Sequence, residues 1–446
     1  MSSPRGLIIA APASGSGKTL LTLGLLRALR DAGHAVAGAK AGPDYIDPAF
    51  HTAASGRPAF NLDPWAMRPE TLAGLLSGAA QTTDTIIVEG VMGLFDGIHL
   101  PDRPDAGSTA DLAAMTGWPV VLVVDASKQA ASVGALVRGF AEHRADVRIA
   151  GVIFNRVASP THEAVLRDAS HAAAPAVRLL GSVGRNPALA MPERHLGLIQ
   201  AGEHADLERF IAAAALTISD TVDVDALVGL AGPCEISRPD TMPPDLLPPL
   251  GQRIAVARDQ AFAFCYPATL DGWRAAGAEI RPFSPLADDP PDPTADAIYL
   301  PGGYPELHAG TLAAADRFLN GLRDAANRGV KIFGECGGYM VLGRGLVDAD
   351  STLHKMADLL PVETSFAARR LHLGYRVAHL HRDGPLGPAG SCFRGHEFHY
   401  ASISNEATES PLFTAENARG EHLGPAGATS GSVCGSFIHL IDRTAA

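Results

Sequence analysis

The chain alternates short, almost entirely apolar runs with longer segments in which apolar residues recur at helical spacing. In the first half the apolar runs consist of β-branched or aliphatic residues, and they span residues 7–10, 35–39, 85–88, 120–124 and 149–154. Runs of this kind, separated by helical stretches, are typical of parallel strands that are covered on both faces. The pattern therefore predicts an α/β fold with a parallel sheet in the first half.

A change in composition divides the chain near residue 232. Prolines then become frequent, at positions 233, 239, 243, 244, 248 and 249, which favours a stiff, extended connector over a folded element. The alternation of strands and helices restarts at residues 253–257. We therefore expect a first domain over residues 1–232, a linker over 233–251 and a second α/β domain over 252–446.

Composition narrows the classes of partner. Hydrophobic residues make up 46% of the 446 positions and charged residues 19%, which is ample for two buried cores. No apolar run approaches the roughly 18 residues of a membrane span, and a net charge of −12 disfavours nucleic acid and anionic lipid as partners. The five cysteines are dispersed without a C-x-x-C pair, which argues against a disulfide framework or a zinc site. We expect a cytoplasmic protein.

A glycine-rich loop lies between the first apolar run and the first helical pattern. Strand, glycine loop and helix in this order form the context of a nucleotide-binding P-loop, in which backbone amides surround phosphate oxygens. The lysine would reach the β- and γ-phosphates and the threonine would hold Mg²⁺. Pro12 stands where the usual pattern has its first glycine. The predicted ATP-binding residues are Ser14, Gly15, Ser16, Gly17, Lys18 and Thr19.

Polar residues at the ends of later strands complete this candidate site. Glu89 ends a hydrophobic strand that should emerge beside the P-loop, so it is a candidate Mg²⁺ ligand. The loop after the second strand offers an amine, Lys40, and two carboxylates, Asp44 and Asp47; a solvated turn would explain these residues equally well. Asn155 closes the fifth strand, where it could read the adenine edge.

The second half contains a candidate nucleophile. Cys336 lies between a strand and a helical pattern, flanked by glycines, as in a nucleophile elbow, and the helix N-terminus is expected to lower the pKa of its thiol. Upstream, Gly302 and Gly303 follow another strand and could supply oxyanion-binding amides. His439, placed at the end of the last strand, is our predicted general base, with His396 and His399 as competitors for that role. With Cys392 these two histidines could also suggest a metal site, but their spacing is poor.

These motifs carry a resemblance that covers nearly the whole chain. Residues 334–338 and 300–305, with a C-terminal histidine, resemble a class I glutamine amidotransferase domain of cobalamin biosynthesis. Residues 11–19, 40–48 and 88–97 are similar to the dethiobiotin-synthetase-like ATP domain fused to it, including Pro12. The chain thus resembles the cobyrinic or hydrogenobyrinic acid a,c-diamide synthases.

The resemblance implies a fold, cofactors and residue roles. The P-loop domain would use ATP and Mg²⁺ to convert a carboxylate of a corrinoid polycarboxylate into an acyl phosphate. Thr19, Asp47 and Glu89 would hold the metal, and Lys40 and Asp44 would orient the substrate. Cys336 and His439 would release ammonia from L-glutamine, with Gly302, Gly303 and Gly337 forming the oxyanion and glutamine site. A homodimer is expected.

Some alternatives stay open at this stage. Triad amidotransferases usually have an acid two residues after the histidine, whereas Ile441 stands there and Asp442 is one position further, so a Cys336–His439 dyad is expected. Cobyric acid synthase shares both domain types, and a P-loop switch ATPase with a degenerate sensing domain is a non-biosynthetic alternative. Residues 11–19 and 40–57 look most similar to those of the aerobic-pathway enzymes, and this resemblance implies the metal-free hydrogenobyrinic acid as substrate.

Overall fold

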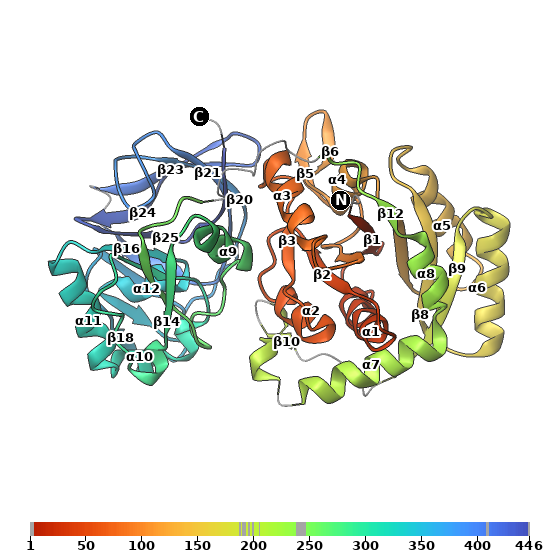
Figure 1. Ribbon diagram of the computed structural model, residues 1–446, viewed down its shortest axis with the longest axis horizontal. Helices are drawn as coiled ribbons and strands as arrows, with labels where there is room; N and C mark the ends of the chain where they lie inside the picture. Colours follow the sequence, from red (N-terminus) through yellow and green to blue (C-terminus); the bar gives the residue numbers. More distant parts are fainter. Residues whose placement is uncertain are drawn as a thin grey trace. The chain divides into compact units, whose positions relative to one another are not determined.

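A computed structural model of the chain describes all residues except 1–3, 187–188, 190–192, 195–196, 199, 205, 238–246, 407–409 and 445–446. The chain divides into two compact units, Met1–Pro243 and Pro244–Ala446. Both are drawn in Figure 1, in red to green and in green to blue respectively. Each unit carries its own sheet, which agrees with the two α/β domains expected from the sequence.

The first unit is built on one mainly parallel sheet with the strand order β3-β2-β4-β1-β7-β8-β9. Its strands are β1 (Arg5–Ala10), β2 (Val36–Ala41), β3 (Phe60–Leu62), β4 (Thr85–Glu89), β7 (Val120–Asp125), β8 (Ile149–Val157) and β9 (Arg178–Gly184). Its helices are α1 (Lys18–Asp31), α2 (Asp47–Ser55), α3 (Pro69–Ala79), α4 (Thr109–Thr116), α5 (Val133–Glu142), α6 (Pro160–Ala173), α7 (Leu207–Thr221) and α8 (Val224–Leu230). Two small hairpins, β5 (Ile98–Leu100) with β6 (Arg103–Ala106) and β10 (Glu193–Arg194) with β11 (Gly197–Leu198), lie outside the sheet.

The apolar runs of the first half form strands, as predicted. Every residue of β2 and β4 is buried, and β1 is buried from Gly6 onward. A strand whose successive residues are all buried must be covered on both faces, because alternate side chains point to opposite sides. The carboxyl ends of β1, β2 and β4 meet at one edge of the sheet, since the three strands run parallel and in neighbouring positions. This edge carries the P-loop, Lys40 and Glu89.

The predicted linker begins too early. Gly232 and Pro233 form a short strand, β12 (Gly232–Pro233), that pairs antiparallel with the start of β1. The next two amides also bond to the first unit: Cys234 N–H donates to Pro4 O and Glu235 N–H to Thr116 O, each over 2.8 Å. A proline is tolerated here because β12 is a short strand in which one N–H is dispensable. The middle of the predicted linker, residues 238–246, lies outside the described residues.

The second unit has a longer sheet that is parallel in one part and antiparallel in the other. The order is β14-β13-β15-β16-β25-β24-β23-β20-β21-β26, with parallel pairing from β14 to β25 and antiparallel pairing beyond. Its strands are β13 (Arg253–Ala257), β14 (Glu279–Phe283), β15 (Ala297–Leu300), β16 (Lys331–Glu335), β20 (His372–Leu380), β21 (Cys392–His399), β23 (Pro411–Asn417), β24 (His422–Ser430), β25 (Val433–Ser436) and β26 (His439–Thr444).

Smaller elements complete the second unit. A separate sheet contains β17 (Gly345–Val347), β18 (Leu353–Lys355), β19 (Val362–Ser365) and β22 (Ser402–Glu406). The helices are α9 (Pro267–Ala275), α10 (Ala309–Ala313), α11 (Asp316–Asn327) and α12 (Gly337–Leu342), with short 3₁₀ turns such as η4 (Pro305–Leu307). Among the described residues no helix has the length and apolar character needed to cross a membrane. The five cysteines are all free, as their dispersed spacing predicts.

Candidate active sites

The P-loop joins β1 to α1 through a backbone that only glycine accommodates at its last turn. Gly17 has a φ of 93°, and a Cβ at this position would lie 2.2 Å from Asn155 Nδ2. The helix therefore begins at Lys18, with the preceding glycine as its cap. Such a loop directs backbone N–H groups and the positive end of a helix toward one point, which favours a phosphate.

A cavity of about 920 Å³ opens beside this loop. Its lining brings together most of the residues predicted for nucleotide, metal and substrate: Ser14, Gly15, Gly17, Lys18, Thr19, Lys40, Asp44, Asp47, Glu89 and Asn155. Ser16 is the exception, because it is buried and its hydroxyl donates to Ala13 O over 2.8 Å. The cavity is large enough for a nucleotide and lies at the carboxyl edge of the parallel sheet, where α/β proteins bind ligands.

Lys18 points across the mouth of the P-loop to a neighbouring loop. Its Nζ donates to the carbonyl oxygen of Met92 over 2.6 Å, and Met92 itself has a φ of 50°. Burial, followed by the positive charge of Lys40, lowers the pKa of Lys18 to about 8. A bound phosphate would offset both effects, because an anion next to the amine favours its charged form.

Glu89 is the centre of a buried network at the end of β4. Thr19 donates to Glu89 Oε1 over 2.5 Å, and Lys40 Nζ lies 2.9 Å from the same oxygen. His51 Nε2 lies 2.7 Å from the other oxygen, Oε2. Lys40 also lies 2.5 Å from Asp47 Oδ2, so one ammonium is shared between two carboxylates.

The charges of this network are unevenly distributed. Burial disfavours the ammonium of Lys40, but Asp47 and Glu89 outweigh burial and raise the pKa of Lys40. Burial also opposes ionisation of Glu89, yet Lys40 and the hydrogen bond from His51 hold the pKa of Glu89 well below its usual range. Burial and the nearby Asp44 carboxylate raise the pKa of Asp47 well above its usual value. The ammonium of Lys40 therefore keeps Glu89 ionised, whereas Asp47 favours its neutral form.

Asp44 and Asn155, two of the residues predicted for this site, make hydrogen bonds with backbone groups. Asp44 uses its Oδ1 to accept the amides of Ile46 and Asp47, over 2.8 and 3.2 Å, so it shapes the turn that starts α2. Asn155 donates to Ser16 O over 2.9 Å and accepts from the Arg156 amide over 2.9 Å. Asn155 therefore braces the P-loop in this structure, and its contact with an adenine edge stays a prediction.

Sequence reasoning missed two residues here. His51 follows Asp47 by four positions in α2, a spacing that places both on one helix face, and this signal was available in the sequence. Asp96 accepts the amide of Gly93 over 2.8 Å and so shapes the loop whose Met92 carbonyl binds Lys18. The sequence offers no signal for that contact, because it depends on how the 90–97 loop folds back on β1.

The turn at Cys336 has the strained geometry of a nucleophile elbow. Cys336 has a φ of 48° and a ψ of −104°, between the end of β16 and the start of α12. Its amide donates to Ser436 O over 2.8 Å, which anchors the turn to β25. A non-glycine residue in this region of φ carries strain, and such strain is typical of functional turns.

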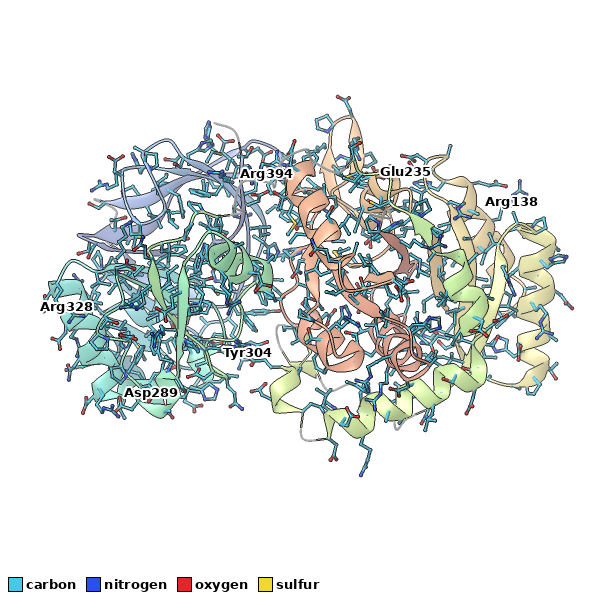
Figure 2. The ribbon with its side chains drawn as sticks, viewed as in Figure 1. Arg138, Glu235, Asp289, Tyr304, Arg328 and Arg394 are labelled. Atoms are coloured by element: carbon cyan, nitrogen blue, oxygen red, sulfur yellow. The ribbon has the colours of Figure 1, made fainter. Side chains whose placement is uncertain are left out.

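Gly302 brings the predicted nucleophile and base together. A Cβ placed on Gly302 would lie 2.4 Å from His439 Cε1 and 3.3 Å from Cys336 Cβ, so the two side chains border the same spot. A Cβ on Gly337 would lie 3.1 Å from the amide nitrogen of Gly303, which places the expected oxyanion residues side by side. Tyr304, labelled in Figure 2, is fully buried and packs edge-on against Phe264 with ring centres 4.8 Å apart, which fixes this loop.

Two expectations about this pair are wrong. His439 begins β26 rather than ending the last strand, because β25 and β26 are separate strands joined by Phe437 and Ile438. Burial, with a smaller contribution from Glu306, raises the pKa of the Cys336 thiol instead of lowering it; α12 has only six residues, and the amide of Gly337 does not offset burial. Burial lowers the pKa of His439 to about 3. At neutral pH the resting pair is therefore a thiol and a neutral imidazole.

The competing histidines are held differently. His399 Nδ1 lies 2.8 Å from Ala401 O and its Nε2 lies 3.0 Å from Glu397 Oε1, so both ring nitrogens have partners. His396 faces His439 across the β21–β26 pair, and burial lowers its pKa to about 4. Neither borders Gly302 as His439 does, so the geometry favours His439. No group of three histidine, cysteine, aspartate or glutamate side chains with metal-site geometry occurs in the described part of the chain.

A β-bulge changes the position of Asp442. Arg394 pairs with Asp442 and Gly395 with Leu440, so Ile441 is the extra residue in β26. Because Arg394 and His396 lie on one face of β21, their partners Asp442 and His439 lie on one face of β26. Asp442 is fully buried, and the bulge gives it the place along the strand that Ile441 would have in a regular strand.

Comparisons with known proteins match each half of the chain to a known domain family. Residues 7–199 match the CobQ/CobB/MinD/ParA nucleotide binding domain, and residues 253–445 match the CobB/CobQ-like glutamine amidotransferase domain. Hydrogenobyrinate a,c-diamide synthase of a Sinorhizobium species is 56% identical over 441 residues, covering 98% of each chain. The protein of the same name from Rhodobacter capsulatus is 52% identical over 439 residues, covering 98% of this chain and 99% of the relative. The chain therefore belongs to the hydrogenobyrinate a,c-diamide synthase family.

Proposed function

We propose that this protein converts two acetate carboxylates of hydrogenobyrinic acid, the a and c groups, into amides with ATP and glutamine. The observation that carries the proposal is the presence of both sites in a chain that matches its diamide synthase relatives over 98% of its length. Cobyrinic acid is the alternative corrinoid. No specific observation favours the cobyric acid synthase or switch ATPase alternatives. The expected homodimer and cytoplasmic location stay predictions.

Activation of the carboxylate takes place in the first unit. A carboxylate does not react with ammonia, so the γ-phosphoryl group of ATP is transferred to it, giving an acyl phosphate and ADP. Lys18 neutralises charge on the transferred group, and the P-loop amides hold the other phosphates. Ammonia then attacks the acyl carbon, and inorganic phosphate leaves as the amide forms.

The donor set of the first site fits Mg²⁺. Thr19, Asp47 and Glu89 offer one hydroxyl and two carboxyl groups that lie in a single network with Lys40. Hard oxygen ligands with remaining positions for phosphate oxygens and water suit this ion. When bound, it would screen the negative charge of the phosphates. Lys40 and Asp44, which also line the cavity, are then placed to orient the substrate carboxylate.

Ammonia release takes place in the second unit. The Cys336 sulfur attacks the side-chain amide of glutamine while its proton passes to His439. His439 then protonates the leaving nitrogen, giving ammonia and a thioester. Water, deprotonated by His439, hydrolyses the thioester to glutamate. The amides of Gly303 and Gly337 stabilise the oxyanion.

We further propose that Asp442 is the third member of a triad. It is fully buried and lies on the same face of β26 as His439. With the bulge, the two residues are two strand positions apart, which separates their Cα atoms by roughly 7 Å. An acid in this position fixes the orientation of the imidazole and stabilises its charged form. The bulge at Ile441 thus accounts for an acid three residues after the histidine instead of two.

The proposed function is tested by assay of the purified protein. Hydrogenobyrinic acid and cobyrinic acid are each incubated with ATP, Mg²⁺ and glutamine, and the products are identified by mass and by the positions of the new amides. Formation of the a,c-diamide supports the proposal. Amides at other carboxylates would favour the cobyric acid synthase alternative, and ATP hydrolysis without any amide would favour the switch ATPase.

A further inference from the structure

Glu335, the residue before the nucleophile, is a buried carboxyl group that the proposed mechanism does not use. It ends β16 and is 2% exposed. Its side chain reaches Tyr299 and the backbone of Leu440, and both of these residues belong to one apolar core with Phe333. Cys336 belongs to the core on the other side. The side chains of Glu335 and Cys336, adjacent in sequence, therefore lie on different faces of the sheet.

Both hydrogen-bond partners of Glu335 are neutral groups on other strands. The hydroxyl of Tyr299, on β15, donates to Glu335 Oε2 over 2.6 Å. The backbone amide of Leu440, on β26, donates to Glu335 Oε1 over 3.0 Å. Burial raises the pKa of Glu335 to about 7, and these two bonds oppose that rise. Both the neutral and the ionised carboxyl can accept the Leu440 amide.

The bond to Leu440 links strands that do not pair in the sheet. β16 pairs with β15 and β25, whereas β26 pairs with β21 at the end of the strand order. Backbone pairing therefore does not set the position of β26 relative to the elbow. The Glu335 side chain supplies a direct connection between them.

His439 lies between two such connections. On one side the amide of Ile438 donates to Ser436 Oγ over 3.1 Å. On the other side the amide of Leu440 donates to Glu335. The amides on both sides of the base are thus tied to residues that flank or contact the elbow, since Ser436 O accepts the Cys336 amide.

We propose that Glu335 is a positioning residue for glutamine hydrolysis, whose carboxyl holds the start of β26 and thereby sets the His439 imidazole against the Cys336 thiol. The inference rests on the proposed roles of Cys336 and His439. A buried carboxyl without an ionic partner is costly, and an apolar residue of similar size would pack in this core more favourably. The presence of the carboxyl is explained by the position that its hydrogen bond imposes on the start of β26.

The test compares Glu335→Ala, Glu335→Gln and Tyr299→Phe for glutaminase kcat and KM. Glu335→Ala removes the acceptor of the Leu440 amide, so kcat should fall by roughly 100-fold with KM changed less than about threefold, as a misplaced base requires. Glu335→Gln keeps a carbonyl acceptor for Leu440 and should restore kcat to within about fivefold. Tyr299→Phe removes only the other hydrogen bond and is the matched control, with kcat expected to stay well above that of Glu335→Ala.

Ammonium-dependent diamide synthesis in each variant reports on folding and on the first unit. It should stay at the unsubstituted level, and equal loss of both activities in all three variants would show a structural role and overturn the proposal. Unchanged kcat in Glu335→Ala, or a loss in Glu335→Gln as large as in Glu335→Ala, would also overturn it. His439→Ala is assayed beside them: if that variant hydrolyses glutamine normally, the proposed function of His439 has failed instead.

Discussion

The hydroxyl of Thr19 donates a hydrogen bond of 2.5 Å to Glu89 although the two residues lie 70 positions apart in the chain. The bond joins the first turn of α1 to the end of β4 and makes the P-loop and the carboxylate one site. Lys40 forms an ion pair with the same carboxylate, and His51 forms a hydrogen bond with it. The first unit is therefore organised around Glu89 as much as around the P-loop.

Lys18→Ala should abolish diamide formation with either glutamine or ammonium as the nitrogen source, because activation of the carboxylate precedes both. A loss of at least about 100-fold is expected for a group that stabilises the transferred phosphoryl. Glutaminase activity should remain measurable. Product is quantified by mass spectrometry. Lys355→Ala, at an exposed position of the second unit, is the matched control. Substantial synthesis by Lys18→Ala would exclude the acyl phosphate mechanism.

Glu89→Gln should weaken the use of Mg²⁺ and ATP while glutamine hydrolysis continues. The amide cannot supply the negative charge that a metal ligand needs, and it leaves the buried Lys40 paired with Asp47 but no longer with a second carboxylate at position 89. A titration of synthesis against Mg²⁺ should shift to at least about tenfold higher concentration. Glu142→Gln, at an exposed position of the same unit, provides the comparison. An unchanged titration would make Glu89 a structural residue.

Cys336→Ser should lose glutamine-dependent synthesis by several orders of magnitude, on the scale of a removed nucleophile. The variant should still form the diamide from a high concentration of ammonium salt at mildly alkaline pH, where more free ammonia is present. Cys234→Ser, in the first unit, should retain both activities. If Cys336→Ser lost ammonium-dependent synthesis while remaining folded, Cys336 would act in carboxylate activation or in its coupling to ammonia supply.

Asp442→Asn tests the proposed triad. The amide cannot stabilise an imidazolium, so glutaminase kcat should fall by roughly 100-fold or more while KM changes little. Initial rates of glutamate release measure the effect, and Asp350→Asn, at an exposed position, controls for loss of one charge. A kcat equal to that of the unsubstituted protein would leave Cys336 and His439 as a dyad.

The pKa of Glu335 predicts a pH dependence of stability in the second unit. The folded-state pKa of about 7 exceeds the usual 4.5, so the folded protein retains this proton to higher pH than the unfolded chain. The free energy of unfolding therefore decreases as pH rises from about 4.5 to 7, by roughly 3 kcal/mol, and this contribution is level above that range. Glu335→Gln lacks the titration. Its stability relative to the unsubstituted protein should rise between pH 5 and pH 8.

The difference in free energy of unfolding between Glu335→Gln and the unsubstituted protein is measured by urea titrations at several pH values. Cleavage of the second unit by a protease reports the unfolded fraction at each urea concentration. Glu421→Gln serves as control, because Glu421 is exposed and its pKa is lowered instead, first by the hydrogen bond from Asn417. A constant difference between Glu335→Gln and the unsubstituted protein across this range would contradict the raised pKa.

Much of the local structure could be predicted from the sequence. The buried strands of the first unit follow from continuous apolar runs, because a strand covered on both faces needs no polar positions. The P-loop and the turn at Cys336 were also predictable, since positive φ at Gly17 and crowding around Gly302 restrict those positions to glycine. Such signals are contained within a few consecutive residues.

The tertiary structure decided which residues distant in sequence come into contact and which ionisable groups are buried. The expected thiolate at Cys336 was wrong because the strength of burial depends on the whole core and not on the neighbouring helix. The place of Asp442 depends on a bulge that appears only when β26 pairs with β21. The contact between Glu335 and Leu440 joins strands that are not neighbours in the sheet. The sequence by itself determined the elements and the reactive residue types, whereas their register and solvation came from packing, because both are properties of several strands together.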